Sequence, residues 1–302
     1  MSRIVFMGTP DYAKEILEKL LKSEFEVLAI FTQPDKPVGR KKVMTPPPVK
    51  VLGEENSIEI HQPKRLRDSE NVDILRELNP DFIVVAAYGQ ILSKEILDIA
   101  PSINLHSSIL PKYRGASPIQ QALLNGDSET GVTSMLMNEG LDTGDILKIS
   151  KLNIDSSWVV GDLYRELTEI AGDLTLTTLR EFNKITPEPQ NDKQATHCSK
   201  ISKSDGEIDF YSADEVLKKY RAFTPWPSIF SESGLKFTDI ELHSSSGNHN
   251  RGEIISIDGD VAIVGCETGS IKVRKLQPKS KKEMTIKAYL NGKRIGIGDT
   301  LL

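Results

Sequence analysis

Short apolar segments alternate with amphipathic, helix-length segments through residues 1–182, and this alternation restricts the fold more than any other feature of the chain. Parallel strands require such long connections between them, and parallel sheets are covered by helices on both faces. We therefore predict a Rossmann-like, doubly wound and mostly parallel α/β domain over residues 1–187. The predicted strands are residues 3–7, 27–32, 82–87, 102–105 and 132–137, and the predicted helices are residues 11–21, 72–78 and 161–182.

The sequence changes character after residue 184. Residues 184–193 carry two prolines and mixed charge with almost nothing apolar, which is typical of a linker. Beyond a predicted helix at 216–223, short β-branched segments are separated by Asp258-Gly259-Asp260 and Thr268-Gly269, and such turns indicate hairpins. We predict a linker over residues 188–205 and a small antiparallel β-domain over residues 206–302. Its predicted strands are residues 254–257, 261–265 and 271–273.

Cysteine usage and hydropathy exclude several classes of protein. Cys198 and Cys266 are far apart and lack CxxC spacing, which argues against a disulfide framework and against a zinc site. No apolar segment approaches the ~20 residues of a membrane helix, and no signal peptide precedes the first predicted strand. We therefore expect a cytoplasmic protein that binds neither a metal nor a membrane.

The charge of the chain is unevenly distributed. The formal net charge of −5 gives no overall prediction of nucleic-acid binding. Residues 272–294, however, contain nine Lys and Arg with only Glu283 opposing them. On charge alone, this segment is more typical of a solvated edge of the β-domain. A surface for a polyanion is the alternative interpretation.

The most informative polar residues stand at the end of the predicted strand 102–105. Asn104 and His106 are two residues apart, and side chains at this spacing point to the same side of a strand. Ligands of doubly wound sheets bind at the carboxyl ends of the strands, which is where this pair falls. Further along, glycines bracket the carboxylate of Asp142 in the segment 140–144. An amide donor, an imidazole and a carboxylate at one sheet edge are the groups that acyl transfer requires.

Three other interpretations of these motifs have less support. A serine beside His106 could suggest a hydrolase triad with Asp142, but the G-x-S-x-G nucleophile elbow is missing. Asp142-Thr143-Gly144 matches the short aspartic-protease signature, but it occurs once, inside an α/β pattern. Gly8-Thr9-Pro10 follows the first strand with a single glycine where a dinucleotide site has G-x-G-x-x-G, which argues against NAD.

Several motifs taken together resemble those of the folate-dependent formyltransferases. They are Asn104-x-His106, Ser108-Ile109-Leu110-Pro111, Arg114-Gly115 and Leu141-Asp142-Thr143-Gly144. Further motifs make the chain similar to the members of this family that act on charged initiator tRNA. These are Gly8-Thr9-Pro10-Asp11, Thr32-Gln33-Pro34-Asp35 and Pro225-Trp226-Pro227, and the resemblance extends from Ile4 to about Leu290.

The resemblance implies transfer of the formyl group of 10-formyltetrahydrofolate, a co-substrate, to the α-amine of methionine on initiator methionyl-tRNA, without a metal. It implies that Asn104 and His106 stabilise the oxyanion and that Asp142 relays a proton. It also implies an OB-like barrel that binds tRNA in the C-terminal domain, where the sequence pattern alone supports only a small β-domain. The residues implied to bind folate are Gln90, Ile91, Leu92, Ser108, Ile109, Leu110, Pro111 and Leu141, and those implied to contact tRNA are Arg40, Lys41 and Lys42.

The segment 33–42 is a long insertion after the second predicted strand. It contains two prolines, a glycine and four basic residues, and we expect it to be a mobile loop. Basic groups here would contact phosphates, and such contacts position an RNA without reading its sequence.

Two other functions stay open on the sequence. A formyltransferase could act on a small amine acceptor, such as an amino-sugar nucleotide or a purine precursor, although such an acceptor needs neither of the basic segments 36–42 and 272–294. The chain could also be a non-enzymatic RNA-binding module, against which the intact set of Asn104, His106 and Asp142 argues. We expect a monomer without an obligate protein partner.

Overall fold

A computed structural model of the chain describes residues 1–39 and 41–302, and Arg40 lies outside the described residues. Contacts between residues divide the chain into two compact units. The first unit comprises residues 1–118, 129–153 and 164–198, and the second comprises residues 119–128, 154–163 and 199–302. The two units are therefore not separated at a single point in the sequence, because two short segments of the predicted N-terminal domain belong to the second unit.

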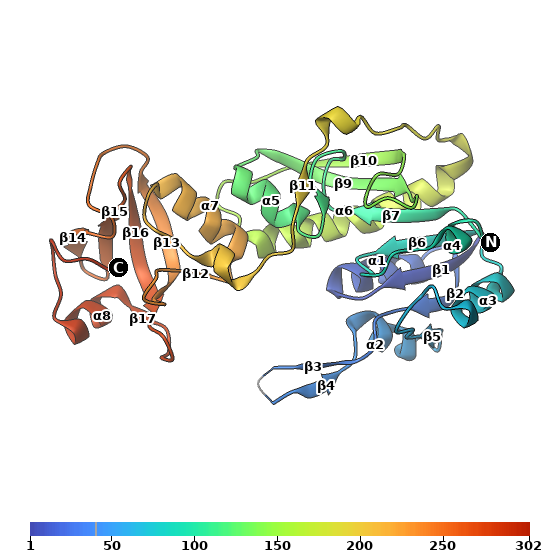
Figure 1. Cartoon of the computed structure of the whole chain (residues 1–302), viewed down its shortest axis with the longest axis horizontal. Helices are drawn as coiled ribbons and strands as arrows, with labels where there is room; N and C mark the ends of the chain where they lie inside the picture. Colours follow the sequence, from blue (N-terminus) through green and yellow to red (C-terminus); the bar gives the residue numbers. More distant parts are fainter. Residues whose placement is uncertain (40) are drawn as a thin grey trace. The chain divides into compact units, whose positions relative to one another are not determined.

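A seven-stranded sheet forms the centre of the first unit (Figure 1). Its strands are β1 (Arg3–Gly8), β2 (Glu26–Phe31), β5 (Glu59–His61), β6 (Phe82–Ala86), β7 (Ser102–His106), β9 (Glu129–Leu136) and β10 (Ile146–Asn153). Their order is β10-β9-β7-β6-β1-β2-β5. The pairs from β7 to β5 are parallel, whereas β9 pairs antiparallel with both β7 and β10. The predicted mostly parallel sheet is confirmed.

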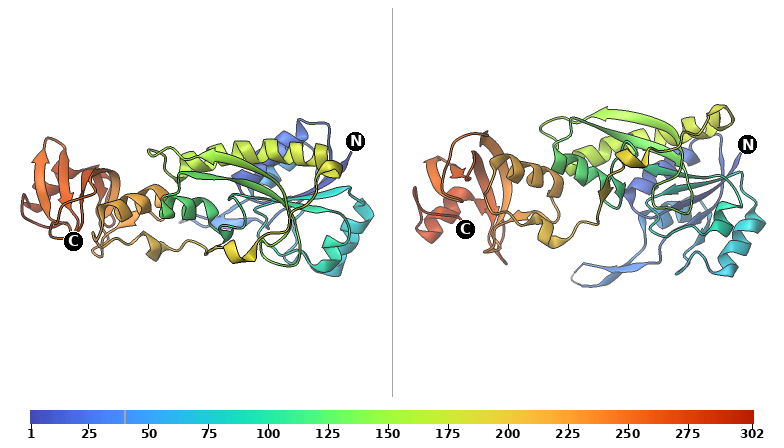
Figure 2. Two further views of the ribbon diagram at one scale, coloured as in Figure 1. Left: turned by 90° about the horizontal axis from the view of Figure 1, so that it is seen from above. Right: turned by 45° about the horizontal axis from the view of Figure 1, so that its top comes forward.

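Helices cover both faces of this sheet (Figure 2). They are α1 (Asp11–Leu21), α2 (Pro48–Glu55), α3 (Ser69–Leu78), α4 (Lys94–Leu97) and α6 (Val160–Glu181). On one face, Val5 and Met7 of β1 belong to a buried cluster that includes residues of α3 and α4. On the other face, Gly8 lies so close to α1 that an added Cβ would be 2.5 Å from the Cβ of Ala13. Helix α6 lies beside α1, where Lys19 pairs with Glu169 at 2.6 Å.

The segment that follows β2 contains two paired strands of a β-hairpin where a loop was predicted. Strand β3 (Lys36–Val38) pairs antiparallel with β4 (Val43–Thr45). At the base of the hairpin, the Asp35 carboxylate accepts hydrogen bonds from Gln62 Nε2 at 2.8 Å and from Lys50 Nζ at 3.0 Å. These two contacts, with that of Gln62 the larger, lower the pKa of Asp35. The loop prediction was wrong because an edge strand tolerates a proline such as the one within β3.

An antiparallel sheet of six strands forms the centre of the second unit. Its strands are β12 (Ile229–Phe230), β13 (Lys236–Ser244), β14 (Ile254–Asp258), β15 (Val261–Gly265), β16 (Ser270–Gln277) and β17 (Met284–Thr285). Their order is β12-β13-β16-β15-β14, and β17 pairs with β16. The pairing of β13 with β16 has three register shifts, and irregularities of this kind increase the bend and twist of paired strands. The predicted small antiparallel β-domain is confirmed.

The other regular elements are short. A parallel pair of two-residue strands, β8 (Arg114–Gly115) and β11 (His197–Cys198), lies outside the main sheet of the first unit. Among residues 1–39 and 41–302, no helix combines the length and the apolar composition that crossing a membrane requires. The remaining helical segments are α5 (Pro118–Asn125), α7 (Ala213–Phe223), α8 (Ile286–Lys293), η1 (Phe182–Lys184), η2 (Asp192–Gln194) and η3 (Lys203–Gly206).

Candidate active site

Strand β7 carries two of the predicted site residues to the carboxyl edge of the sheet. Ile103 and Leu105 are buried in the core, so the alternate residues Asn104 and His106 project from the opposite face of the strand. The side chain of Asn104 is half-buried. His106 is only 6% exposed, and a ring so deeply buried needs protein partners for its two nitrogens.

Asp142 reaches the same place from the turn between β9 and β10. Its backbone φ is 54°, in the left-handed region that is costly for a residue with a side chain. The turn passes so close to the end of β9 that a Cβ added at Gly144 would lie 1.8 Å from the carbonyl oxygen of Leu136. A glycine is therefore required at position 144 because two backbone segments approach each other closely there.

The three side chains meet at one carboxylate oxygen. Oδ1 of Asp142 lies 3.5 Å from Nδ2 of Asn104 and 3.6 Å from Nδ1 of His106. The other oxygen, Oδ2, accepts a hydrogen bond from the backbone N–H of Gly115 at 2.8 Å. The structure thus brings together an amide, an imidazole and a carboxylate from two separate segments of the chain.

A backbone carbonyl fixes the orientation of the imidazole. Nε2 of His106 lies 2.9 Å from the carbonyl oxygen of Tyr113, and because a carbonyl can only accept, Nε2 carries a hydrogen and donates it. Nδ1 is therefore the atom that faces Asp142, at a distance too long for a direct hydrogen bond. The backbone roles of Tyr113 and Gly115 were not predicted from the sequence, where the motif Arg114-Gly115 was the one signal that pointed to this segment.

Two of the residues expected to bind folate are exposed apolar side chains. Ile91 is 77% exposed and Leu141 is 66% exposed, and exposed apolar groups beside polar site residues are typical of a surface that a ligand covers. Leu92 and Leu110 are buried instead, so they anchor their loops in the protein core. Of these four expected folate residues, two are therefore placed to contact a ligand and two to pack beneath the loops.

The polar residues of the expected folate site already have protein partners. Oε1 of Gln90 accepts a hydrogen bond from the Leu66 N–H at 2.8 Å, and its Nε2 donates to the Pro63 carbonyl at 3.0 Å. The Ser108 hydroxyl donates to the Lys112 carbonyl at 2.6 Å. Both side chains therefore hold their loops in shape. The two remaining members of the expected set, Ile109 and Pro111, are partly exposed.

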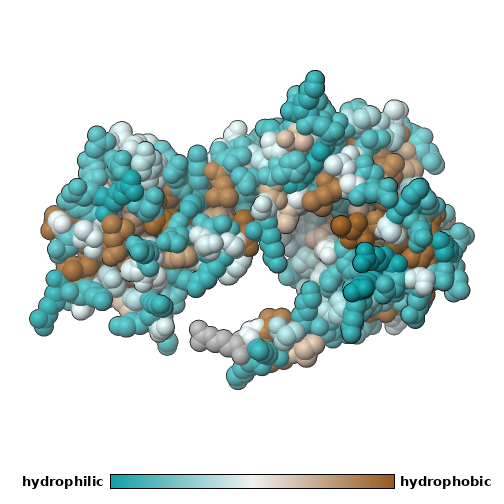
Figure 3. All heavy atoms as spheres, viewed as in Figure 1, coloured by the Kyte–Doolittle hydropathy of each residue, from teal (hydrophilic) through white to brown (hydrophobic). Residues whose placement is uncertain are grey.

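The basic residues expected to contact tRNA lie in the connection between β3 and β4. Lys41 and Lys42 are exposed, and Arg40 lies outside the described residues. The hairpin also presents hydrophobic atoms at its surface (Figure 3). Basic and apolar side chains together suit a nucleic-acid end, because phosphates attract the charges and unpaired bases offer faces for stacking. The apolar side chains are Val38, Val43 and Met44, which are 57%, 59% and 60% exposed.

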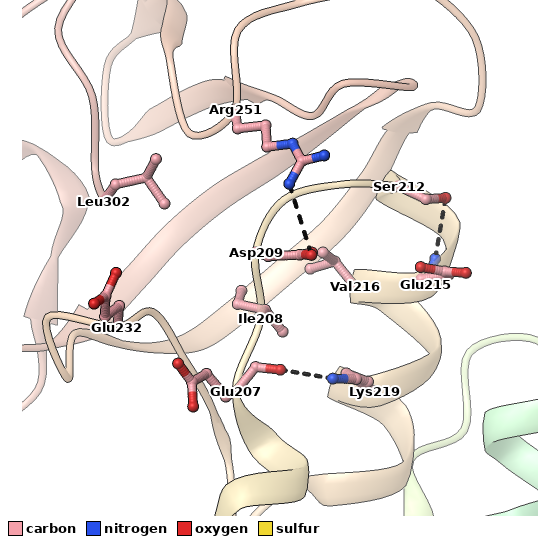
Figure 4. Close-up of a pocket in the computed structure, with 10 residues that line it drawn as sticks. All are labelled: Glu207, Ile208, Asp209, Ser212, Glu215, Val216, Lys219, Glu232, Arg251 and Leu302. Atoms are coloured by element: carbon pink, nitrogen blue, oxygen red, sulfur yellow. Dashed lines mark hydrogen bonds and ion pairs between the residues drawn. The ribbon is translucent and has the colours of Figure 1, made fainter.

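A separate cavity of about 540 Å³ lies in the second unit (Figure 4). Four of its ten lining residues are acidic and two are basic, and both basic side chains have partners. Nζ of Lys219 donates to the Glu207 carbonyl at 2.6 Å, and Arg251 lies 3.8 Å from Asp209. None of the predicted site residues lines this cavity. Within the described part of the chain, no group of three or more His, Cys, Asp or Glu side chains is arranged to hold a metal ion.

Comparisons with known proteins find relatives over the whole chain. The family described as Formyl transferase matches residues 2–179, and the family described as Formyl transferase, C-terminal domain, matches residues 200–294. A protein of Sulfurimonas denitrificans named methionyl-tRNA formyltransferase is 57% identical over 300 residues, which covers 99% of each chain. A protein of Nitratiruptor with the same name is 56% identical over 300 residues, with the same coverage.

A solved structure shares the fold at low sequence identity. The N-formyltransferase of Helicobacter canadensis, in complex with folinic acid and dTDP-3-aminofucose, superposes with a TM-score of 0.69. It is 20% identical, and the match covers 90% of this chain and 99% of that one. At this level of identity, the likeness shows a common fold.

Proposed function

The chain belongs to the formyl transferase family, and we propose that it transfers the formyl group of 10-formyltetrahydrofolate to the α-amine of methionine on charged initiator tRNA. Relatives named methionyl-tRNA formyltransferase match it from end to end at 57% and 56% identity, which supports this acceptor. The observation that carries the chemistry is the meeting of Asn104, His106 and Asp142 at one carboxylate oxygen.

Asn104 is the proposed donor to the oxyanion. When the amine attacks the formyl carbon, the carbonyl oxygen gains negative charge at a tetrahedral centre. Nδ2 of Asn104 carries two hydrogens, of which one points toward Asp142 and the other is available to this oxygen. A fixed donor aimed at a developing oxyanion is worth about 10²–10³ in rate.

His106 and Asp142 are the proposed carriers of the proton; for His106 this replaces the oxyanion role that the resemblance implies, because Nε2 already donates to the Tyr113 carbonyl and Nδ1 faces Asp142. The attacking amine forms a bond to the formyl carbon and loses a proton, while the bond from that carbon to the folate nitrogen breaks and the nitrogen gains a proton. Because Nε2 of His106 donates to the Tyr113 carbonyl, Nδ1 of His106 and Oδ1 of Asp142 face each other at 3.6 Å, and the proposed proton passes between them through a bridging water. A proton taken from the amine can pass through this pair to the leaving nitrogen.

The folate is proposed to lie against Ile91 and Leu141. Met137, which precedes the loop that carries Leu141, packs against the same buried cluster as Leu92. The two loops that present the exposed side chains therefore share one support. Apolar cover from these side chains and hydrogen bonds from the backbone of both loops suit a flat ring with donor and acceptor edges.

The tRNA is proposed to contact the β3–β4 hairpin through Arg40, Lys41 and Lys42, and the second unit through the basic segment 272–294. Part of that segment is neutralised, because Arg274 donates to Glu241 at 2.8 Å and Lys275 lies 3.5 Å from Glu283. The lysines of the connection from β16 to β17 are exposed and supply positive charge for phosphates. They are Lys279, Lys281 and Lys282.

Single-turnover transfer from 10-formyltetrahydrofolate tests the proposal, with charged initiator tRNA, charged elongator tRNA and an amino-sugar nucleotide as competing acceptors. We expect strong preference for the initiator, and loss of transfer in a His106→Ala variant. Transfer to the amino-sugar nucleotide alone would replace the acceptor and leave the proposed chemistry in place. Failure with every acceptor would refute the proposed function.

A further inference from the structure

We infer that Gln190 is a positioning residue that holds the Asp142 turn in the shape the reaction requires, an inference that rests on the proposed function. Gln190 lies on residues 188–198 of the first unit, a segment that we term the strap. The strap hydrogen-bonds to the Asp142 turn at one end and to residues 113–116 at the other. The strap therefore contacts the turn that carries Asp142 and the segment 113–116 whose backbone groups orient His106 and Asp142.

Every hydrogen-bonding group of the Gln190 amide is used. Nε2 donates to the backbone carbonyls of Asp142 at 2.9 Å and of Gly144 at 2.7 Å. Oε1 accepts from Nε and Nη2 of Arg114 at 3.0 and 2.8 Å. The orientation of the amide is fixed by its partners, because the carbonyls can only accept and the guanidinium can only donate. Gln190 is therefore locked between a buried arginine and the turn that carries the proposed proton carrier.

The Asp142 turn needs such support. A side chain held at positive φ carries strain on the order of 1–3 kcal/mol, which persists only where the surrounding structure fixes the backbone. The two bonds from Gln190 attach to the strained residue itself and to Gly144, so they bracket the turn. Just beyond it, Ile146 and Glu188 exchange backbone hydrogen bonds at 2.8 and 2.9 Å, which extends the contact along the strap.

The other end of the strap fixes the partners of the imidazole and the carboxylate. The Arg114 N–H donates to the Thr196 carbonyl at 2.9 Å, and the Tyr113 N–H donates to the Thr196 hydroxyl at 2.9 Å. Tyr113 in turn accepts from His106, and Gly115, which pairs with Cys198, donates to Asp142. The strap thus ties the imidazole side and the carboxylate side of the site into one hydrogen-bonded frame.

Gln190 reaches the reaction through Asp142, because its amide is bonded to the backbone of the turn and to Arg114. Loss of the amide leaves two turn carbonyls without their donor and allows the carboxylate to move away from His106. A misplacement of about 1 Å near reacting groups costs on the order of 10²-fold in rate. The contacts that bind folate and tRNA in the proposed site do not include Gln190, so substrate binding is expected to change little.

The test compares Gln190→Ala and Gln190→Glu with Gln194→Ala, an exposed glutamine of the same strap. Gln190→Glu keeps an acceptor for Arg114 and loses both donors to the turn. We expect both Gln190 variants to lower kcat by about 10²-fold, with KM values for folate and tRNA within about twofold of the parent. Gln194→Ala should behave as the parent. The inference is overturned if the KM for folate or tRNA rises while kcat is unchanged. It is also overturned if kcat stays within twofold of the parent in both Gln190 variants.

A double-mutant cycle separates positioning from a general structural role. If Gln190 acts through Asp142, then Gln190→Ala costs little additional kcat in an Asp142→Ala background. Fully additive losses overturn the inference. The ¹⁵N resonances of the His106 ring in the free protein give a readout that needs no activity, and we expect them to shift in Gln190→Ala and not in Gln194→Ala. If they shift while the parent fails to formylate any tRNA, the proposed function fails and the positioning role of Gln190 stands.

Discussion

Gly115 and Asp142 are joined by a 2.8 Å hydrogen bond from the backbone N–H of the first to Oδ2 of the second. This bond turns the carboxylate so that Oδ1 faces Asn104 and His106. The φ of Gly115 is 120°, and a Cβ added there would lie 2.2 Å from the Cys198 carbonyl oxygen. The orientation of the proposed proton carrier therefore depends on a position where a side chain has no room.

Gly115→Ala should impair both folding and catalysis. The added Cβ must displace the strand that carries Cys198, and the positive φ adds backbone strain. We expect the free energy of unfolding to fall by about 2–4 kcal/mol, measured by urea denaturation, and formyl transfer to fall with the loss of the bond to Asp142. Gly161→Ala is the matched control, because an added Cβ there meets nothing within 4 Å in helix α6. It should raise stability by about 0.5–1 kcal/mol, and equal losses in both variants would contradict the packing argument.

Asp142→Asn should remove the proton relay and leave the fold intact. The amide can still accept the hydrogen bond from Gly115 but cannot hold a proton between itself and His106. We expect kcat for formyl transfer to fall by about 10²–10⁴-fold, with KM values nearly unchanged, in steady-state assays. Asp98→Asn, which breaks an exposed pair with Lys94, is the control and should cost less than about 1 kcal/mol of stability and no activity. Activity close to that of the parent in Asp142→Asn would remove Asp142 from the mechanism.

Ile91→Ser and Leu141→Ser should weaken folate binding without loss of stability. Both side chains are mostly exposed in the free protein, so their truncation leaves no cavity in the core. Each loses apolar surface that the folate would cover, at about 0.8 kcal/mol per buried CH₂. We therefore expect the KM for folate to rise about tenfold, with an unchanged melting temperature. Ile297→Ser removes a similarly exposed side chain from the second unit and should change neither value; an equal rise there would rule out a specific contact.

Lys41→Gln and Lys42→Gln together should weaken tRNA binding and reduce its dependence on salt. Each phosphate contact that is lost lowers the slope of log K against log salt by about 0.7–0.9. Filter binding of charged initiator tRNA at several salt concentrations measures this slope. Lys22→Gln changes an exposed lysine that pairs with Glu18 and serves as the control. Slopes that are identical in the variant and the parent would show that the hairpin does not contact phosphates.

The Asp35 carboxyl should titrate below its ordinary pKa in the folded protein. Gln62 and Lys50 stabilise its charged form, so the folded pKa lies below the unfolded value of about 3.9. Its contribution to stability is therefore present above the unfolded pKa and is lost as the pH falls through the folded pKa. A ¹³C NMR titration of the carboxyl carbon measures this shift, and Gln62→Ala should return the pKa toward its ordinary value. A pKa that is the same in the parent and the variant would contradict the assigned cause.

Local patterns in the sequence were sufficient for the main elements of the fold. Residues 11–21 carry apolar side chains at helical spacing and form α1 with those bounds. The apolar segment at 82–87 forms β6, and the Asp-Gly turn at 258–260 joins β14 to β15. These predictions succeeded because periodicity and turn chemistry act over a few residues. The same local geometry placed Asn104 and His106 on one side of β7.

Elements that depend on distant partners were missed. Strand β10 lies at the edge of the sheet and forms only through its pairing with β9. Strand β3 contains a proline, which in the isolated sequence is a loop signal. Strand β13 pairs with β16 across 26 to 41 residues and has irregular register. Such strands gain their stability from pairing, and pairing cannot be derived from the periodicity of one segment.

Residue types and their spacing were sufficient to predict the fold class and the kinds of side chain available for catalysis. Which atoms of those side chains meet depends on the folding of the whole first unit. This folding directs Nε2 of His106 to the Tyr113 carbonyl, turns Oδ1 of Asp142 toward Nδ1, and places Gln190 against a turn that is 48 residues away in the chain. Distances of this kind depend on strand register and on the packing of remote segments, whereas residue type and spacing act only on neighbours along the chain.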